Sequence, residues 1–202
     1  CVRYTPRLFE HVYTGTKADK KRALEASDIG TLVRGTEMDL SKRIPSSSLQ
    51  KAKMLFVFMF MMRGLPFVDL AFLHKKDLQG NVLSYRRRKT GRTLRVLLSP
   101  EALQLVHMVS NKDENSPYLF PILRSKDGTE AAYKEYQSAL RRFNYQLSAL
   151  KTHLNMSSHL SSYSARHTWA TMAYYCEIHP GIISEAMGHL SLIHISEPTR
   201  PY

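Results

Sequence analysis

The sequence predicts a mainly α-helical domain with a small antiparallel β-sheet, which is an α+β fold. Several segments carry apolar residues at helical spacing and are bordered by residues that begin or end helices. One pair of neighbouring segments has the β pattern instead, and a glycine-containing connection joins the two. No internal repeat is visible.

The most apolar helix is expected at residues 49–62. The run Pro45-Ser46-Ser47-Ser48 is a helix start signal, and Gly64 is a plausible residue just beyond the C-terminus. Residues 54–62 are apolar on all sides, so this helix is expected at the centre of the core. A second, shorter helix is expected at residues 66–73.

The other elements follow from their border residues. A short helix is expected to begin near Asp28, with Ser27 and Asp28 as candidate caps. Residues 82–85 and 93–98 are expected to form a β-hairpin. Ser99-Pro100 begins a helix, since proline suits the first helical position. Further helices are expected at 129–152, 161–176 and 180–187, the last ended by Gly188.

Composition restricts the class of protein. The 202 residues suffice for one domain and a piece of a second, and 43% are hydrophobic. Lys plus Arg exceed Asp plus Glu by 29 − 17 = 12, which favours a polyanionic partner, nucleic acid first. The two cysteines give neither a disulfide framework nor a zinc spacing, which fits a reducing cytoplasm. The longest apolar run is too short to span a membrane.

Two basic features precede the middle of the chain. Arg63 directly follows the apolar helix, where a cation also favours the helix dipole without any functional role. The expected hairpin tip, residues 86–92, has five cations in seven residues. A phosphate backbone would relieve their mutual repulsion, although a solvated charged turn is the alternative.

Two further features lie near the C-terminal end. Tyr163 and Arg166 are three residues apart, so they share a helix face, and a Ser161-Ser162 cap would place both at a helix N-terminus that favours anions. The alternative is an ordinary helix start with a surface arginine. Gly188-His189 follows a helix end, where the alternative is a C-cap followed by a surface histidine.

Taken together, the order and spacing of these features resemble the tyrosine recombinases, the phage integrase family. The pattern is an Arg-Gly after a core helix, a hairpin lysine, the run Tyr163-Ser164-Ala165-Arg166-His167-Thr168 and a final Gly-His. Recombinases of Bacteroidetes mobile elements are the nearest look-alikes, since they often carry tyrosine where others have the first histidine of His-x-x-Arg. The resemblance covers roughly residues 20–189.

The resemblance implies metal-free and cofactor-free DNA transesterification. It makes Arg63 and Arg166 the clamps on the scissile phosphate, because guanidinium forks match phosphate oxygens. It makes Lys89 the acid that protonates the leaving 5′-oxygen. His189 would donate a hydrogen bond to a non-bridging oxygen. Tyr163 would bond the phosphate or orient Arg166, since a phenol cannot act as a base near neutral pH.

The resemblance also implies the partners. The remaining hairpin arginines are expected to hold the DNA backbone: Arg86, Arg87, Arg88 and Arg92. Double-stranded DNA at a recombination site is the expected partner, and a tetramer on DNA is the expected assembly. The expected location is the bacterial cytoplasm, associated with the nucleoid, and no membrane is involved.

The family's nucleophilic tyrosine has no counterpart here. It is expected about nine residues after the Gly-His histidine, where this chain has Pro198. Residues 190–202 resemble the translation of a sequencing-library adapter, so they are expected to be non-native. Residues 17–189 are assigned to a truncated catalytic domain, and residues 1–16 to the tail of a core-binding domain and its linker. This fragment is expected to be inactive alone.

Three alternatives differ in class. The first is a catalytically dead DNA-binding regulator of a full-length recombinase, which would not need all of Arg63, Lys89, Arg166 and His189. The second is a basic RNA-binding domain, which would want aromatic stacking platforms on a sheet, whereas the hairpin offers only Tyr85. The third is a type IB topoisomerase, which shares the fold but resembles this sequence less.

Overall fold

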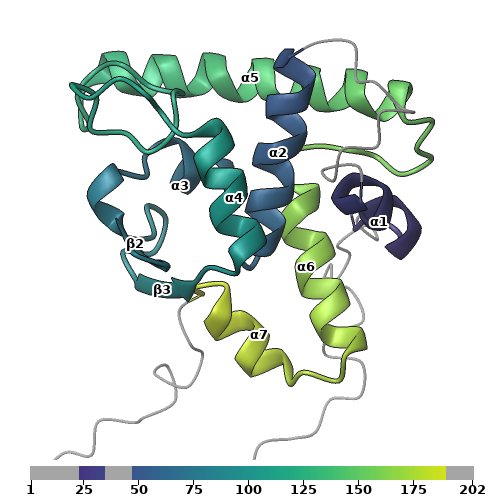
Figure 1. Ribbon diagram of the computed structural model, residues 1–202. Helices are drawn as coiled ribbons and strands as arrows, with labels where there is room; N and C mark the ends of the chain where they lie inside the picture. Colours follow the sequence, from purple (N-terminus) through teal and green to yellow (C-terminus); the bar gives the residue numbers. More distant parts are fainter. Residues whose placement is uncertain (1–22, 35–46, 190–202) are drawn as a thin grey trace, which may run out of the picture.

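Helix α2 (Ser47–Met61) passes through the middle of the helical part of the molecule (Figure 1). The computed structural model describes residues 23–34 and 47–189. Helix α2 contacts four other helices, and the side chains of Phe56, Val57, Phe58 and Met59 are buried in its central turns. The expected central helix is therefore confirmed. Its Pro45-Ser46 start signal lies outside the described residues.

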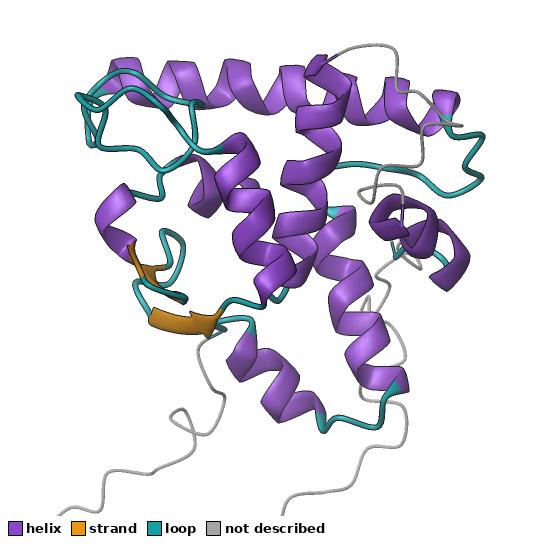
Figure 2. Cartoon of the chain, viewed as in Figure 1, coloured by secondary structure: helices purple, strands orange, loops and turns teal. Residues whose placement is uncertain are grey.

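The described elements are mostly helices with one small set of strands, which confirms the predicted α+β class (Figure 2). Those other than α2 are α1 (Ala26–Arg34), α3 (Phe67–Ala71), a 3-10 turn (Lys75–Asp77), β1 (Leu78–Gln79), β2 (Val82–Arg86), β3 (Thr93–Leu97), α4 (Pro100–Val109), α5 (Glu130–His153), α6 (Ser164–Tyr175) and α7 (Pro180–Ala186).

The sheet is a three-stranded antiparallel sheet in the order β1-β2-β3. The predicted hairpin is confirmed, with Tyr85 opposite Leu94 and Arg86 opposite Thr93. Side chains alternate across β2 and β3, so Leu83 and Tyr85 are buried while Arg86 is exposed. Strand β1 was not expected, because two residues are too few to show a period.

Helix starts were predicted with mixed success. Helix α4 begins at Pro100 as predicted, and the Ser99 side chain caps it by accepting a hydrogen bond from the Ala102 amide at 3.3 Å. Helix α1 begins at Ala26, so Ser27 and Asp28 lie in its first turn and do not cap it. The Ser161-Ser162 cap of α6 was wrong as well. Tyr163 is the N-cap there and makes no side-chain capping bond.

Helix α7 brings the end of the described chain back to the sheet. It packs on α6 through a small apolar cluster that includes Ala173, Ile183 and Met187. Gly188, with a φ of 71°, ends the helix as expected, and Figure 1 shows the end of α7 beside β3. The fold therefore places Gly188 and His189 next to the hairpin.

Within residues 23–34 and 47–189, no helix has the length and apolar character to cross a membrane. The two segments assigned from the sequence to a preceding domain (1–16) and to a non-native tail (190–202) lie outside the described residues. Their assignment stays a prediction.

Candidate functional site

A cleft of about 470 Å³ lies between the start of α3, the hairpin tip, α5 and the start of α6. Four of the five predicted catalytic residues line it: Lys89, Tyr163, Arg166 and His189. They come from the hairpin, from α6 and from the residues after α7, so segments that are 100 residues apart in sequence meet here.

Arg166 forms the fixed cation of the cleft. Its side chain is only 7% exposed. Its Nη1 donates to the carbonyl of Gly64 and its Nη2 to the carbonyl of Met187, both at 2.9 Å. A guanidinium has five N–H donors, so among the described contacts donors remain for a ligand oxygen. Burial, with help from Arg87, lowers the pKa of Arg166 to about 10, so the group stays charged at neutral pH.

Gly64 explains why Arg166 can lie so close to the end of α2. Its φ is 69°, a left-handed conformation that glycine adopts without strain. A Cβ atom at this position would lie 2.6 Å from the Cα atom of Arg166. The Arg-Gly pair after the apolar helix therefore has a packing role that is independent of any ligand.

Arg63 is the one predicted catalytic residue that is not among the lining residues of the cleft. Its charge acts on the phenol of Tyr85. Burial raises the pKa of Tyr85 and Asp69 adds to the rise, while the charges of Arg87, Arg166 and Arg63 oppose it. The role of Arg63 as a phosphate clamp stays a prediction.

The hairpin tip is tied to the residues after α7. The Thr90 hydroxyl donates to the carbonyl of Gly188 at 3.0 Å, and Arg92 Nη1 donates to the carbonyl of His189 at 2.9 Å. Arg92 Nη2 also pairs with Glu185 at 2.6 Å. These bonds hold Lys89 and His189, which are both exposed, on neighbouring parts of the cleft rim.

The imidazole of His189 lies in a positive environment. Partial burial lowers its pKa, and the charges of Arg166, Arg87 and Lys89 lower it further. The neutral ring that results has one N–H donor and one acceptor nitrogen at physiological pH. It can therefore donate a hydrogen bond to an anionic oxygen, which is the role that the resemblance implies.

Tyr163 lies at the mouth of the cleft as the N-cap residue of α6. Its side chain is 50% exposed, and its ring packs edge-on against His167 at 4.6 Å between centroids. The predicted common face of Tyr163 and Arg166 is confirmed, since both line the cleft. The two differ in burial, so the phenol is the accessible group.

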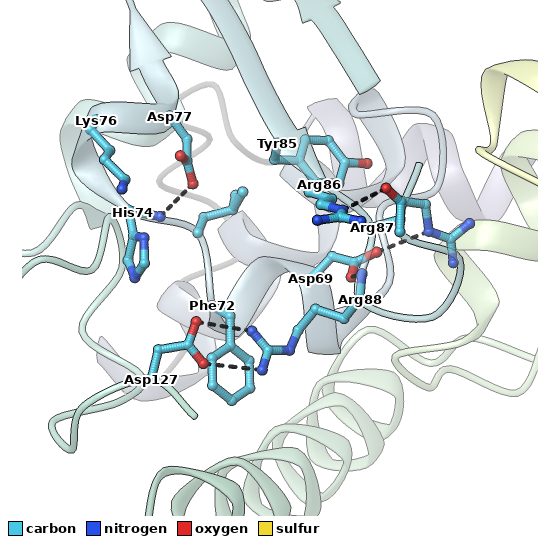
Figure 3. A pocket seen from close by; sticks show the side chains of 12 residues that line it. Asp69, Phe72, His74, Lys76, Asp77, Tyr85, Arg86, Arg87, Arg88 and Asp127 are labelled. Carbon is cyan, nitrogen blue, oxygen red and sulfur yellow. Dashed lines mark hydrogen bonds and ion pairs between the residues drawn. The ribbon is translucent and has the colours of Figure 1, made fainter. Parts of the chain in front are cut away.

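The four hairpin arginines expected to hold DNA are all engaged within the protein. Arg86 Nε donates to the carbonyl of Gly91 at 2.7 Å. Arg88 pairs with both oxygens of Asp127 and lies 3.7 Å above the centre of the Phe72 ring (Figure 3). Like Arg92, these two remain at least partly accessible.

Arg87 is the exception, because most of its side chain is buried although it contributes to the lining of the cleft. It is 5% exposed, its Nε pairs with Asp69 Oδ2 at 3.1 Å and its Nη1 donates to the carbonyl of Met187. Figure 3 shows the pairing with Asp69. This placement argues against Arg87 as a direct ligand of the DNA backbone, contrary to the expectation from sequence.

Asp69 is a residue that sequence reasoning missed, and it contacts the cleft through its ion pair with Arg87. It is 3% exposed and lies in α3, where apolar residues precede and follow it. A single carboxylate inside a short apolar helix was the available signal, since buried charges are nearly always paired. Sequence alone gives no means of choosing its partner among the clustered arginines.

No group of three or more His, Cys, Asp or Glu side chains that could hold a metal ion occurs in the part of the chain that the structure describes.

The titration of His189 tests the electrostatics of the cleft. We expect its pKa, followed by NMR of the imidazole carbons, to lie below the usual value of about 6.5. Lys89→Gln should raise it, because one of the opposing cations is removed, whereas Lys112→Gln should not. Because the folded-state pKa is lowered, the stability that His189 contributes is lost as pH falls from about 6.5 through the folded value. An unchanged pKa in Lys89→Gln would contradict the assigned environment.

The profile described as Phage integrase family matches residues 36–198. The match therefore includes residues 190–198, which lie outside the described residues. A search of curated protein sequences found no match.

Three solved structures illustrate the structural similarity. The XerA recombinase has a TM-score of 0.56 at 15% identity, covering 85% of this chain and 56% of that one. The Tn1549 transposon integrase in complex with transposon right end DNA has a TM-score of 0.56 at 15% identity, covering 91% and 64%. The XerH site-specific recombinase bound to its difH substrate has a TM-score of 0.55 at 15% identity, covering 86% and 48%.

At this identity the likeness shows the fold. The chain spans less than two thirds of the length of each of these three structures.

Proposed function

The chain belongs to the phage integrase family, and on that premise we propose that it carries the catalytic cleft of a mobile-element enzyme for site-specific DNA recombination and integration. Residues 17–189 are the catalytic domain of this proposal. The observation that carries it is the position of Arg166, a buried guanidinium held by two carbonyls at the cleft that Lys89 and His189 also line. Fixed cations around an accessible space are what a phosphoryl-transfer site needs.

In the proposed reaction a tyrosine that this chain does not itself supply loses its phenolic proton to water, and its oxygen attacks the scissile phosphorus. A 3′-phosphotyrosyl bond forms as the bond to the 5′-oxygen breaks. Arg166 donates to the non-bridging oxygens, because it is already oriented and needs no rearrangement. Lys89 gives a proton to the leaving 5′-oxygen, and His189 donates a hydrogen bond to the phosphate. A 5′-hydroxyl of the partner strand then attacks the phosphotyrosine and restores the tyrosine.

Tyr163 and Arg63 have supporting parts in this proposal. Tyr163 is accessible at the mouth of the cleft, where its hydroxyl bonds the phosphate or orients Arg166. Arg63 adds a second guanidinium once DNA is bound, which requires its side chain to turn toward the cleft. Its neighbour Gly64 already supplies the carbonyl that holds Arg166.

Double-stranded DNA is the proposed partner, held by the accessible hairpin residues Arg86, Arg88 and Arg92, and a tetramer on DNA is the proposed working assembly. The net charge of +12 supports the choice of a polyanion. Of the similar structures, the Tn1549 integrase was solved in complex with transposon right end DNA, and XerH was solved bound to its difH substrate.

Charge reversal at the cleft rim tests DNA binding. We expect Lys89→Glu to weaken the affinity for a DNA duplex about tenfold or more, measured by fluorescence anisotropy at 0.15 M salt, because a phosphate contact becomes a repulsion. Lys112→Glu is the matched control, since it makes the same change on the loop after α4, outside the lining of the cleft. Equal losses in both variants would assign the effect to net charge and count against the cleft.

We further propose that this chain lacks the tyrosine nucleophile of its family, so the alternative function is that of a DNA-binding regulator without cleavage. We expect no covalent adduct when the chain is incubated with a nicked duplex that traps phosphotyrosyl intermediates and is then denatured. Mass spectrometry of the tryptic peptides would locate any adduct. A phosphotyrosyl adduct at Tyr202 would overturn the proposed absence.

A further inference from the structure

Arg87 and Arg166 share one hydrogen-bond acceptor, the carbonyl of Met187. This carbonyl ends α7, two residues before His189. A shared acceptor means that the position of one guanidinium affects the other, because both bonds must be satisfied by the same oxygen.

Asp69 fixes Arg87 on the other side. Its Oδ2 pairs with Arg87 Nε at 3.1 Å, and its Oδ1 accepts from the backbone amide of Arg88 at 2.9 Å. The carboxylate thus holds both the Arg87 side chain and the hairpin backbone next to it. Both side chains of the ion pair are at most 5% exposed, so solvent screens this arrangement little.

Arg87 also packs directly against the turn that carries His189. A Cβ atom added to Gly188 would lie 2.6 Å from Arg87 Cδ, which shows how closely the two approach. The contacts therefore form a continuous series, from Asp69 in α3 through Arg87 and the Met187 carbonyl to Arg166 in α6.

We propose that Asp69 and Arg87 are positioning residues, which hold the Met187–His189 turn and the Arg166 guanidinium in the geometry needed to bind phosphate. The proposal rests on the proposed function for its purpose, but its structural part can be judged separately. Arg87 acts through its neighbours and is not itself a ligand of the DNA backbone.

If Arg87 acted only as a source of positive charge, the Asp69→Asn variant would change phosphate binding in the opposite direction. Asp69→Asn removes a negative charge close to the cleft, so a purely electrostatic effect would tighten phosphate binding. Loss of positioning would weaken it, because the asparagine cannot hold the guanidinium as an ion pair does. The direction of the change separates the two.

Asp127→Asn is the matched control. It removes a carboxylate that pairs with the next hairpin arginine, Arg88, yet touches neither the Met187 carbonyl nor Arg166 in the described contacts. Electrostatics alone would change the affinity for phosphate in the same direction in both variants.

The first measurement is amide hydrogen exchange in the full chain. The amides of Gly188 and His189 donate to the carbonyls of Glu185 and Ser184, so their protection reports on the order of the turn. We expect Asp69→Asn to speed their exchange about tenfold or more, with core amides such as that of Leu147 and the Asp127→Asn variant unchanged. Unchanged exchange in a folded Asp69→Asn variant would overturn the proposal.

The second measurement is a titration with inorganic phosphate, followed by NMR at the ring resonances of His189. We expect the affinity to fall severalfold in Asp69→Asn and not in Asp127→Asn, and tighter binding in Asp69→Asn would overturn the positioning role. Arg87→Lys keeps the charge but cannot bond Asp69 and Met187 as a fork does, so it should fail to preserve the affinity. The Arg87→Lys variant also provides the test of the positioning role if Asp69→Asn does not fold. Absence of any phosphate response in the unaltered chain would count against the proposed function, and the exchange result would still decide the positioning role.

Discussion

Replacing Gly64 with alanine is expected to lower the free energy of unfolding by about 2–4 kcal/mol. Part of the loss is the strain of alanine at a φ of 69°. The larger part is steric, because the new Cβ would lie 2.6 Å from a backbone atom, the Cα of Arg166, and cannot be relieved by a side-chain rotation. Urea unfolding followed by circular dichroism measures the change.

Gly80→Ala is the control for this substitution. Gly80 has a φ of 58°, and a Cβ there would meet nothing within 4 Å. It should cost about 1 kcal/mol, the strain alone. Equal losses in the two variants would mean that α6 moves away from α2 without cost. In that case the geometry of Arg166 would not depend on the close approach of the two helices.

A functional consequence follows from the same contact. If α6 shifts to accommodate the alanine, the Arg166 guanidinium cannot keep both of its 2.9 Å bonds to Gly64 and Met187. The DNA affinity of Gly64→Ala should therefore fall under conditions where the variant is still folded, whereas that of Gly80→Ala should not.

The elements with a distinctive pattern of residue types could be predicted from the sequence. The helix around Phe58 was recognised because it is apolar on all sides, and the hairpin from Val82 to Leu97 because apolar and polar residues alternate along its strands. The start of α6 could not be predicted in this way. Ser161 and Ser162 look like caps, but the Ser162 amide donates to Asn144 of α5 at 2.8 Å, a partner that only the tertiary fold supplies.

Most of the predicted catalytic residues could be found from the order and spacing of motifs in the sequence. Lys89, Tyr163, Arg166 and His189 do meet in one cleft. The separate environments of the hairpin arginines were not predictable, because adjacent residues of one charged run end in different places. Arg86 is exposed while Arg87 is buried on Asp69, and this depends on what α3 and α7 place beneath the hairpin.

The buried ion pair of Asp69 and Arg87 should contribute little to net stability, even though breaking it should be costly. Burial raises the pKa of Asp69 despite the opposing Arg88 amide and Arg87 charge, so desolvation outweighs the attraction. Asp69→Leu should nevertheless lower the free energy of unfolding by about 3–5 kcal/mol, because it leaves Arg87 buried without its partner and close to Arg166.

The double variant Asp69→Leu/Arg87→Met should recover about 2 kcal/mol or more of that loss, since it removes the uncompensated charge and keeps an apolar side chain of similar length. Recovery should remain incomplete, because the Arg88 amide loses its carboxylate acceptor. Urea unfolding of the two single variants and the double variant forms the thermodynamic cycle, and additive losses would contradict the argument. In the double variant the amides of Gly188 and His189 should still exchange hydrogen faster than in the unaltered chain, even though stability is partly recovered. That result would show that the pair is retained for the geometry of the cleft, which an apolar replacement cannot supply.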